Sequence, residues 1–242
     1  MSNSAVAFDA AKQPQDAVAY YSDVASDFHA SYKNDANRLE RVKIWRGYFD
    51  RFLQDVTFAY DMGCGSGILA CELAGRGIET IGIDGASNML AIAARSAEQQ
   101  KLGNVTFQQH RLPIQDTAPF RVADAIISSS ALEYLDSMPV ALASLHRMIR
   151  PGGTMIFSVS NYDSLSRKAV RLVHSLTGKP AYFGLLKQFM TVAQIQTDLR
   201  ATGYTYLAHS YFAKSDRLNR ILGTVLPERL ASNMIIVAAR RD

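Results

Sequence analysis

The stretch Phe58-Ala-Tyr-Asp-Met-Gly-Cys-Gly-Ser-Gly-Ile-Leu-Ala70 decides the fold of this 242-residue chain. An apolar, β-rich run leads into three glycines at alternate positions, and a helical pattern follows. Glycine permits a tight turn and lets a ligand lie against bare backbone. The first amides of the following helix point toward such a ligand. The stretch therefore predicts a strand, a turn and a helix, with a binding site at the turn.

Short β-rich runs alternate with helical patterns on both sides of this unit. The expected strands are Thr57–Met62, Thr80–Ile83, Val105–Gln108, Asp124–Ser129, Met155–Val159, Thr205–His209 and Met234–Ala238. Helices are expected between the first five, near residues 67–76, 86–101 and 137–150. This alternation predicts an α/β fold whose seven-stranded sheet is mostly parallel, with helices on both faces. The last two runs are close enough in sequence to pair antiparallel at the sheet edge.

The chain divides into an N-terminal helical lid, residues 1–55, and a core, residues 56–242. Residues 160–190 interrupt the regular alternation with a helix over Ser164–Leu176. Gly178 and Pro180 end that helix. We interpret this insert as a cap over the site rather than as a separate domain.

Composition bounds the class of protein. The chain is 48% hydrophobic and 20% charged, which fits one globular domain. Its two cysteines are too few for a zinc site or a disulfide framework. The longest apolar runs fall short of the roughly 20 residues of a membrane span, and the N-terminus shows no secretory signal, so we expect a cytoplasmic protein. A net charge of +4 suits an anionic ligand but does not argue for nucleic acid.

Two carboxylates sharpen the prediction of a binding site. Asp61 directly precedes the glycines, and Asp84 ends the next expected strand. A carboxylate at the tip of a second strand is where a ribose diol is commonly bound. The spacing Gly-x-Gly-x-Gly, with Ile68 next, differs from the Gly-x-Gly-x-x-Gly of dinucleotide-binding folds. The alternative is an ordinary strand–helix turn in which Asp84 caps a helix.

These motifs resemble class I S-adenosylmethionine-dependent methyltransferases. The resemblance lies in Tyr60–Gly67, in Asp84 with Ser87-Asn-Met-Leu90 after it, and in Pro151-Gly-Gly153. The most similar group is the small-molecule branch that includes ubiquinone-biosynthesis and sugar O-methyltransferases. The resemblance covers residues 20–160 closely. It implies a Rossmann-like fold, S-adenosylmethionine as cofactor and S-adenosylhomocysteine as product.

The resemblance also implies which residues hold the cofactor. Asp61 would hold the methionine ammonium, directly or through water, and Asp84 would bond both ribose hydroxyls. The other implied positions are Gly63, Cys64, Gly65 and Gly67 against the methionine, Gly85 and Met89 beside the adenine, Ser128 and Ser129 near the sulfonium, and Tyr20 over the methionine carboxylate. Met89 has an equally good alternative as a core residue of its helix.

One position departs from the family pattern. An Asp that bonds the adenine amine is common after the third strand, but here Arg111 stands near that place. An arginine cannot accept a hydrogen bond from an amine. Adenine recognition is therefore expected to use backbone amides around His110–Leu112, with the Arg111 stem packed on the ring.

Three side chains are candidates for catalysis. Methyl transfer from a sulfonium needs proximity and alignment, and a base only where the acceptor must lose a proton. Ser129-Ser-Ala-Leu-Glu-Tyr-Leu135 matches a family stretch that often reads Leu-Glu-His, with Tyr134 in place of the histidine. Glu133 and Tyr134 are thus candidate bases, although each has a structural alternative as a helix cap or a packed ring. His110 is near the cofactor by position. No metal-ligand pattern is present.

The sequence leaves the acceptor open. Our first hypothesis is O-methylation of a small molecule, and the alternatives are an N- or C-methyltransferase or a non-catalytic cofactor-binding protein. Arg38 and Arg46 are candidates for an anionic contact. Basic faces on Ser164–Leu176 and Ser215–Leu226 (the latter with Arg217 and Arg220) fit an anionic substrate, a membrane surface or ordinary solvated helices. We prefer the last interpretation. Nothing in the sequence specifies an oligomeric state.

Overall fold

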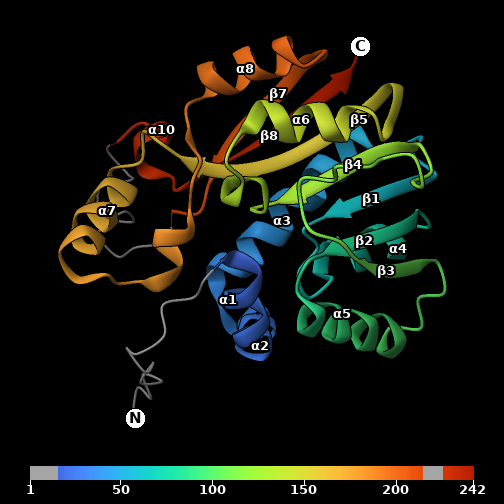
Figure 1. The fold of residues 1–242 in the computed structure, drawn as a ribbon, viewed down its shortest axis with the longest axis horizontal. Coiled ribbons are helices and arrows are strands. Elements are labelled where there is room, and N and C mark those ends of the chain that lie inside the picture. Colours follow the sequence, from blue (N-terminus) through green and yellow to red (C-terminus); the bar gives the residue numbers. More distant parts are fainter. Residues whose placement is uncertain (1–15, 215–225) are drawn as a thin grey trace.

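The computed structural model describes residues 16–214 and 226–242, whose arrangement Figure 1 shows. The strands are β1 (Phe58–Met62), β2 (Glu79–Asp84), β3 (Val105–Gln109), β4 (Ala123–Ser129), β5 (Ile149–Asn161), β6 (Phe189–Met190), β7 (Tyr204–Phe212) and β8 (Met234–Arg241). The helices are α1 (Ala17–Asp23), α2 (Ala25–Asn34), α3 (Ala36–Phe52), α4 (Ile68–Gly75), α5 (Ser87–Gln99), α6 (Met138–His146), α7 (Leu165–Thr177), α8 (Val192–Ala201) and α10 (Glu228–Ala231), with 3₁₀ turns η1 (Leu132–Tyr134) and η2 (Ala181–Leu185). The helix expected over Ser215–Leu226 falls, but for its last residue, outside the described residues.

The sheet has the order β3-β2-β1-β4-β5-β8-β7, and β6 pairs with β5 beside this path. The strands from β3 to β5 run parallel, whereas β8 is antiparallel to both β5 and β7. The predicted mostly parallel α/β sheet is therefore confirmed. The antiparallel strand lies one place in from the edge that β7 forms. The extra strand, β6, has two residues, too few for a periodic pattern to reveal.

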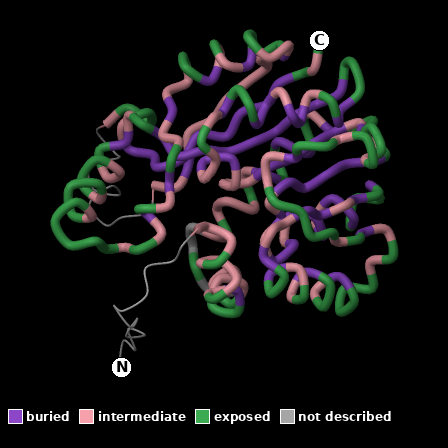
Figure 2. The backbone as a smooth tube through the Cα atoms, in the orientation of Figure 1, coloured by how far each residue is buried: buried purple, intermediate pink, exposed green. Residues whose placement is uncertain are grey.

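Helices cover both faces of the sheet and bury it, as the purple strands in Figure 2 show. All five residues of β1 are buried. Phe58, Tyr60 and Met62 pack on the side of α6 and α8, whereas Ala59 packs on the side of α3 and α4. Because side chains alternate along a strand, Asp61 points to the same side as Ala59. A carboxylate thus stands in an otherwise apolar row.

The N-terminal helices divide between two roles. Trp45, Phe49 and Leu53 of α3 are buried with β1, β4 and α4 and form part of the core. The short helices α1 and α2 pack on α5 and stand beside the carboxyl ends of β1 and β4 (Figure 1). Of the described part of the segment that we expected to form a lid, residues 1–55, only α1 and α2 therefore stand over the ends of the strands. Helix α3 belongs to the core.

The turn from α6 into β5 comes earlier than the sequence suggests. Helix α6 ends at His146 and β5 begins at Ile149, whereas we expected a helix to residue 150 and a strand from Met155. The Pro151-Gly-Gly153 segment continues the strand. A Cβ at Gly153 would lie 2.8 Å from the carbonyl oxygens of Arg150 and Asp124. Only glycine therefore lets β5 approach β4 this closely.

Helix α7 presents its apolar side to solvent. Leu172 and Leu176 are 63% and 77% exposed, whereas Arg167 is turned inward, with its Nη2 3.2 Å from the sulfur of Met234. This arrangement reverses the usual burial of an amphipathic helix. None of the described helices is long and apolar enough to cross a bilayer.

The Asp124 side chain of β4 forms hydrogen bonds to the amino ends of β1 and β5. These bonds lie at the opposite end of the strands from the glycine turn. The Asp124 carboxylate accepts hydrogen bonds from the Thr57 amide (3.0 Å) and hydroxyl (2.8 Å), from the Phe58 amide (3.0 Å) and from Arg150 Nε (2.8 Å). Burial alone would raise the pKa of Asp124, but the bonds from Arg150 and Thr57 outweigh it and hold that pKa well below its usual range.

We expect Asp124→Asn to lower the free energy of unfolding by about 1–3 kcal/mol near neutral pH, because charged hydrogen bonds are lost. The depressed pKa makes this contribution complete above the unfolded-state pKa of about 3.9, and it declines as the pH falls toward the native value. Urea denaturation should therefore separate wild type from variant at neutral pH and bring them together in acid.

Asp50→Asn is the control, because Asp50 forms an exposed ion pair with Arg76 (2.5 Å). Such pairs contribute about 0–1 kcal/mol. An equal loss of stability in both variants would contradict the role given to Asp124.

Candidate functional site

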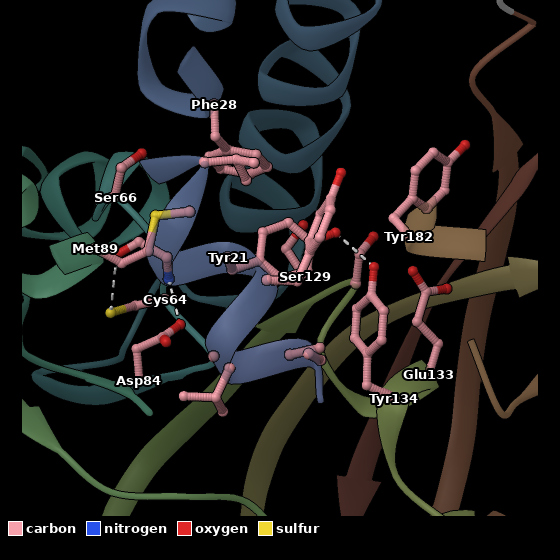
Figure 3. Close-up of a pocket in the computed structure, with 18 of the residues that line it drawn as sticks. Tyr21, Phe28, Cys64, Ser66, Asp84, Met89, Ser129, Glu133, Tyr134 and Tyr182 are labelled. Carbon is pink, nitrogen blue, oxygen red and sulfur yellow. Dashed lines mark hydrogen bonds between the residues drawn. The ribbon is translucent and has the colours of Figure 1, made fainter. Parts of the chain in front are cut away.

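A cavity of about 970 Å³ opens at the carboxyl ends of β1, β2 and β4. In Figure 3 its two sides are distinct: Cys64, Asp84 and Met89 lie on one, and Glu133, Tyr134 and Tyr182 lie on the other. Tyr21 and Ser129 stand between them. Ligands of open parallel sheets bind in this place, because the loops after the strands diverge there.

The glycine turn forms the wall beneath α2. Gly63, Gly65 and Gly67 have φ values of +73°, +52° and +77°, which favour glycine. A Cβ at Gly63 would lie 2.2 Å from that of Ala131, and one at Gly67 would lie 2.7 Å from that of Ala93. Gly65 is different: only Phe28 comes within 4 Å, at 3.7 Å, and the residue lines the cavity. The turn therefore leaves bare backbone facing the open space.

Asp84 braces this turn from the neighbouring strand. One carboxylate oxygen accepts the Gly65 amide and the other accepts the Ala86 amide, each at 2.8 Å. Burial raises the pKa of Asp84, and these backbone hydrogen bonds oppose the rise. Each oxygen keeps a lone pair, and the half-buried side chain lines the cavity. The Asp84 carboxylate can therefore hold the glycine turn in place and, at the same time, accept hydrogen bonds from a ligand.

Asp61 lies at the floor of the cavity without a partner. Its side chain is 1% exposed, and neither carboxylate oxygen has a hydrogen-bond partner among the described residues. Burial, and then the nearby Asp84, raise the pKa of Asp61 to about 8, against a smaller opposing effect of the Ala70 backbone amide. An unpaired buried carboxylate is costly, and a cationic ligand group would stabilise it.

Not every predicted cofactor residue reaches the cavity. Gly63, Cys64 and Gly65 line it, but Gly67 and Ser128 lie behind its wall. The Ser128 hydroxyl is buried and donates to the Met62 carbonyl oxygen at 2.8 Å, which is a structural role. Burial raises the pKa of the Cys64 thiol well above its usual value, so the thiol stays neutral.

Four of the residues predicted around the adenine line the cavity, namely Gly85, Met89, Arg111 and Leu112, whereas His110 does not. Gly85 packs against Val18 of α1, where a Cβ would meet a methyl group at 2.7 Å. Met89 is 1% exposed and packs with α2, so it is a core residue that also reaches the lining. Arg111 lines the cavity beside Leu112 and pairs with Asp16 at 2.7 Å.

The roof of the cavity is aromatic. Tyr20, predicted from the sequence, and Tyr21, which was not, both line it from α1. The hydroxyl groups of Tyr21 and Tyr134 are 2.5 Å apart, so α1 is tied to η1 across the cavity (Figure 3). Burial raises the pKa of Tyr21 to about 12 and that of Tyr134 well above its usual value. Both phenols therefore stay protonated, which leaves Tyr134 as a hydrogen-bonding group.

Glu133 is the remaining candidate base within the cavity. It is 3% exposed and lines the side opposite Asp84, and its Oε2 has no hydrogen-bond partner in the described part of the chain. Ser129 lies beside it in the lining. His110, in contrast, is exposed outside the lining, and its ring packs edge-on against Phe120 with centroids 5.1 Å apart. The structure does not bring His110 to the other candidates.

Sequence reasoning missed several cavity residues. Besides Tyr21, these are Phe28, Arg41 and Tyr182. Arg167 lines the cavity as well, although we preferred to interpret the basic face of its helix as solvated. Arg41 follows the predicted Arg38 by three positions, so the two share one face of α3, and this spacing was a usable signal. Arg46 lies elsewhere and pairs with Glu72. The inward position of Arg167 depends on how α7 packs, which no local pattern reports.

The known sequences that this chain resembles are those of methyltransferases. A family described as "Methyltransferase domain" matches residues 60–157. The ubiquinone biosynthesis O-methyltransferase of Acinetobacter baylyi is 30% identical over 108 residues, 44% of each chain. That of Coxiella burnetii is 27% identical over 176 residues, 70% of each chain. The chain thus matches less than half of the length of the Acinetobacter relative.

Two solved structures show the same fold. Magnesium protoporphyrin IX methyltransferase from Synechocystis PCC 6803, with bound S-adenosylhomocysteine, superposes with a TM-score of 0.70 at 16% identity, over 93% of this chain and 98% of that one. Geranyl diphosphate C-methyltransferase from Streptomyces coelicolor gives 0.64 at 15% identity, over 85% and 81%. At these identities the likeness concerns the fold alone.

The state of Asp61 predicts an unusual dependence of stability on pH. Its native pKa lies above the unfolded-state value of about 3.9, so the native protein keeps a proton that the unfolded chain has released. The stabilisation is complete below about pH 4 and is lost as the pH rises through about 8. We expect Asp61→Asn to reduce this slope and to make the ligand-free protein more stable than wild type above pH 8. Thermal unfolding from acid to mildly alkaline pH measures the difference.

Asp50→Asn again serves as control, because Asp50 is exposed and its loss should leave the slope unchanged. A wild-type slope that survives in Asp61→Asn would contradict an unpaired carboxylate at this position.

Proposed function

We propose that the chain is a class I S-adenosylmethionine-dependent methyltransferase that transfers the methyl group of that cofactor to a small molecule, which the family match over residues 60–157 and the names of the relatives support. The observation that carries this proposal is the unpaired carboxylate of Asp61, buried beside a bare glycine turn and one strand from Asp84. An ammonium, a methionine backbone and a ribose diol match these three features in order.

The cavity residues fit this cofactor. Asp61 would receive the ammonium, and its two free oxygens would then have a cationic partner. Asp84 would accept the ribose hydroxyls with the lone pairs that the Gly65 and Ala86 amides leave open. Gly65 leaves room for the methionine, because a side chain at that position would project into the cavity. Bound S-adenosylmethionine supplies a methyl group already activated on a sulfonium.

The chain then has to align the acceptor and exclude water. Helix α1 roofs the cavity, from Val18 on Gly85 at one end to Tyr21 on Tyr134 at the other. Ser129, at the end of β4, lies between the two ends. An acceptor bound against Ser129 and the tyrosine pair would face the glycine turn.

We propose oxygen as the accepting atom, because a buried carboxylate stands on the acceptor side. Glu133 can take the proton of a hydroxyl group at its free Oε2. Tyr134 and Tyr21, both protonated, orient the acceptor through hydrogen bonds. The O-methyltransferase names of the relatives agree with this assignment.

Cofactor binding is the first test. We expect S-adenosylhomocysteine to raise the thermal midpoint of the protein, as a ligand of the native state does, and NAD to leave it unchanged. Asp84→Asn should raise the dissociation constant for S-adenosylhomocysteine about tenfold or more, because charged hydrogen bonds to the ribose are weakened. Titration calorimetry measures it, with Asp50→Asn as the control. Equal shifts with NAD and S-adenosylhomocysteine would overturn the assignment.

The role of Glu133 is tested on an acceptor found by screening phenols, sugars and amines for release of S-adenosylhomocysteine. We expect Glu133→Gln to lower kcat about a hundredfold or more while cofactor affinity stays unchanged. The loss should shrink as the pH rises for phenols that ionise by themselves. An unchanged kcat would remove Glu133 as the base.

A further inference from the structure

Two arginines converge on the part of the cavity beside Phe212 and Met234. Arg41 of α3 donates from Nη1 to the hydroxyls of Ser130 (2.8 Å) and Ser129 (3.1 Å). Its guanidinium carbon lies 5.7 Å from the centre of the Phe212 ring. Arg167 of α7 reaches the sulfur of Met234. Phe212 and Met234 are direct partners in the β7–β8 ladder and pack in one cluster, so both guanidinium groups lie at the same corner.

Neither arginine has a counter-ion there. Among the described residues, Arg41 and Arg167 form no ion pair, and Arg167 Nε is buried without any acceptor. Two other cations of the lining are neutralised, since Arg111 pairs with Asp16 (2.7 Å) and Lys187 pairs with Asp136 (2.6 Å). A third, Arg38, stacks over the Phe28 ring. Two cations without counter-ions at one half-buried corner repel each other and lose hydration. An anionic ligand group would offset both costs.

This corner is separate from the cofactor end of the cavity. The glycine turn and Asp84 follow β1 and β2, whereas Met234 begins β8 and Phe212 ends β7. In the sheet order, β4 and β5 lie between β1 and β8, so two strands separate the turn from Met234, the contact of Arg167. Arg41, in contrast, reaches this corner from Ser129 and Ser130 at the end of β4, the neighbour of β1. The guanidinium group nearer the turn is that of Arg38, 4.3 Å from the centre of the Phe28 ring, which itself packs on Gly65. Arg167 therefore lies beyond the glycine turn in the strand order, and Arg41 connects this corner to the end of β4.

Given the methyl transfer proposed above, on which this inference rests, we propose that the acceptor carries an anionic group, a carboxylate or a phosphate, and that Arg41 and Arg167 bind it. The planar guanidinium fork matches the paired oxygens of both groups. The hydroxyls of Ser129 and Ser130 already orient Arg41 toward this corner. The acceptor is thus fixed at its charged end, and the remainder of the molecule extends toward Glu133 and the glycine turn.

Three aryl compounds of similar size test the charge directly: benzoate, phenyl phosphate and the neutral benzamide. Each is titrated by calorimetry into protein saturated with S-adenosylhomocysteine and, separately, into the ligand-free protein. We expect benzoate or phenyl phosphate to bind and benzamide not to bind. The tighter of the two anions identifies the group as carboxylate or phosphate.

Variants locate the binding. Arg41→Met and Arg167→Met should each raise the dissociation constant of the anion about tenfold or more, as the loss of a charged hydrogen-bond partner does, while affinity for S-adenosylhomocysteine is kept. Arg41→Lys and Arg167→Lys keep the charge without the fork and should show smaller rises. Arg46→Met on α3 and Lys168→Met on α7 are matched controls that remove a cation outside this corner, and they should behave as wild type.

Each outcome decides a specific point. Binding of benzamide as tight as that of benzoate, no binding of either anion, or anion binding that survives in Arg41→Met and Arg167→Met would overturn the inference. A loss of S-adenosylhomocysteine affinity in these variants would assign the arginines to the cofactor and overturn it as well. Failure of wild type to bind S-adenosylhomocysteine would instead overturn the proposed function, and the titrations of ligand-free protein would still report on the anion site.

Discussion

The buried, unpaired carboxylate of Asp61 is the constraint on which the site depends. A lone carboxylate in the apolar row of a central strand destabilises the folded state, because its burial without a hydrogen-bond or charge partner costs free energy. Here the carboxyl group stands where β1 enters the glycine turn, and Asp84 on the neighbouring strand adds a second carboxyl group close to it. The two side chains make the floor of the cavity acidic, so the folded chain favours a cationic ligand at this point.

The sheet topology turns this local feature into a site with two ends. Strand order places the acidic floor over β1 and β2 and the arginine corner over β8 and β7, with β4 and β5 between. Helix α1 spans both ends, since it contacts Gly85 through Val18 and Tyr134 through Tyr21. The cavity therefore has two buried or half-buried carboxyl groups at one end, two arginines without counter-ions among the described residues at the other, and a roof that joins them. A cationic methyl donor and an anionic acceptor fit this polarity.

Features that depend on residues close together in the chain could be predicted from the sequence. The glycine turn, Asp61 and Asp84 are local, and alternating strands and helices fix which strands are parallel. Contacts between distant segments could not be predicted, because they depend on packing. The Tyr21–Tyr134 pair joins residues 113 apart, and Arg41 meets Ser130 across 89 positions. Helix α7 is the clearest case: its periodicity is plain, yet its basic side supplies Arg167 to the cavity while Leu176 faces solvent.

Proton release on ligand binding tests the central claim most directly. At pH 7 a carboxyl group with a pKa of about 8 is mostly protonated, and it must ionise to face an ammonium. Calorimetry of S-adenosylhomocysteine binding in buffers of different ionisation enthalpy should therefore report the release of most of one proton per site at pH 7 from wild type and much less from Asp61→Asn. Binding without proton release in wild type, or with equal release in both proteins, would contradict the account of Asp61.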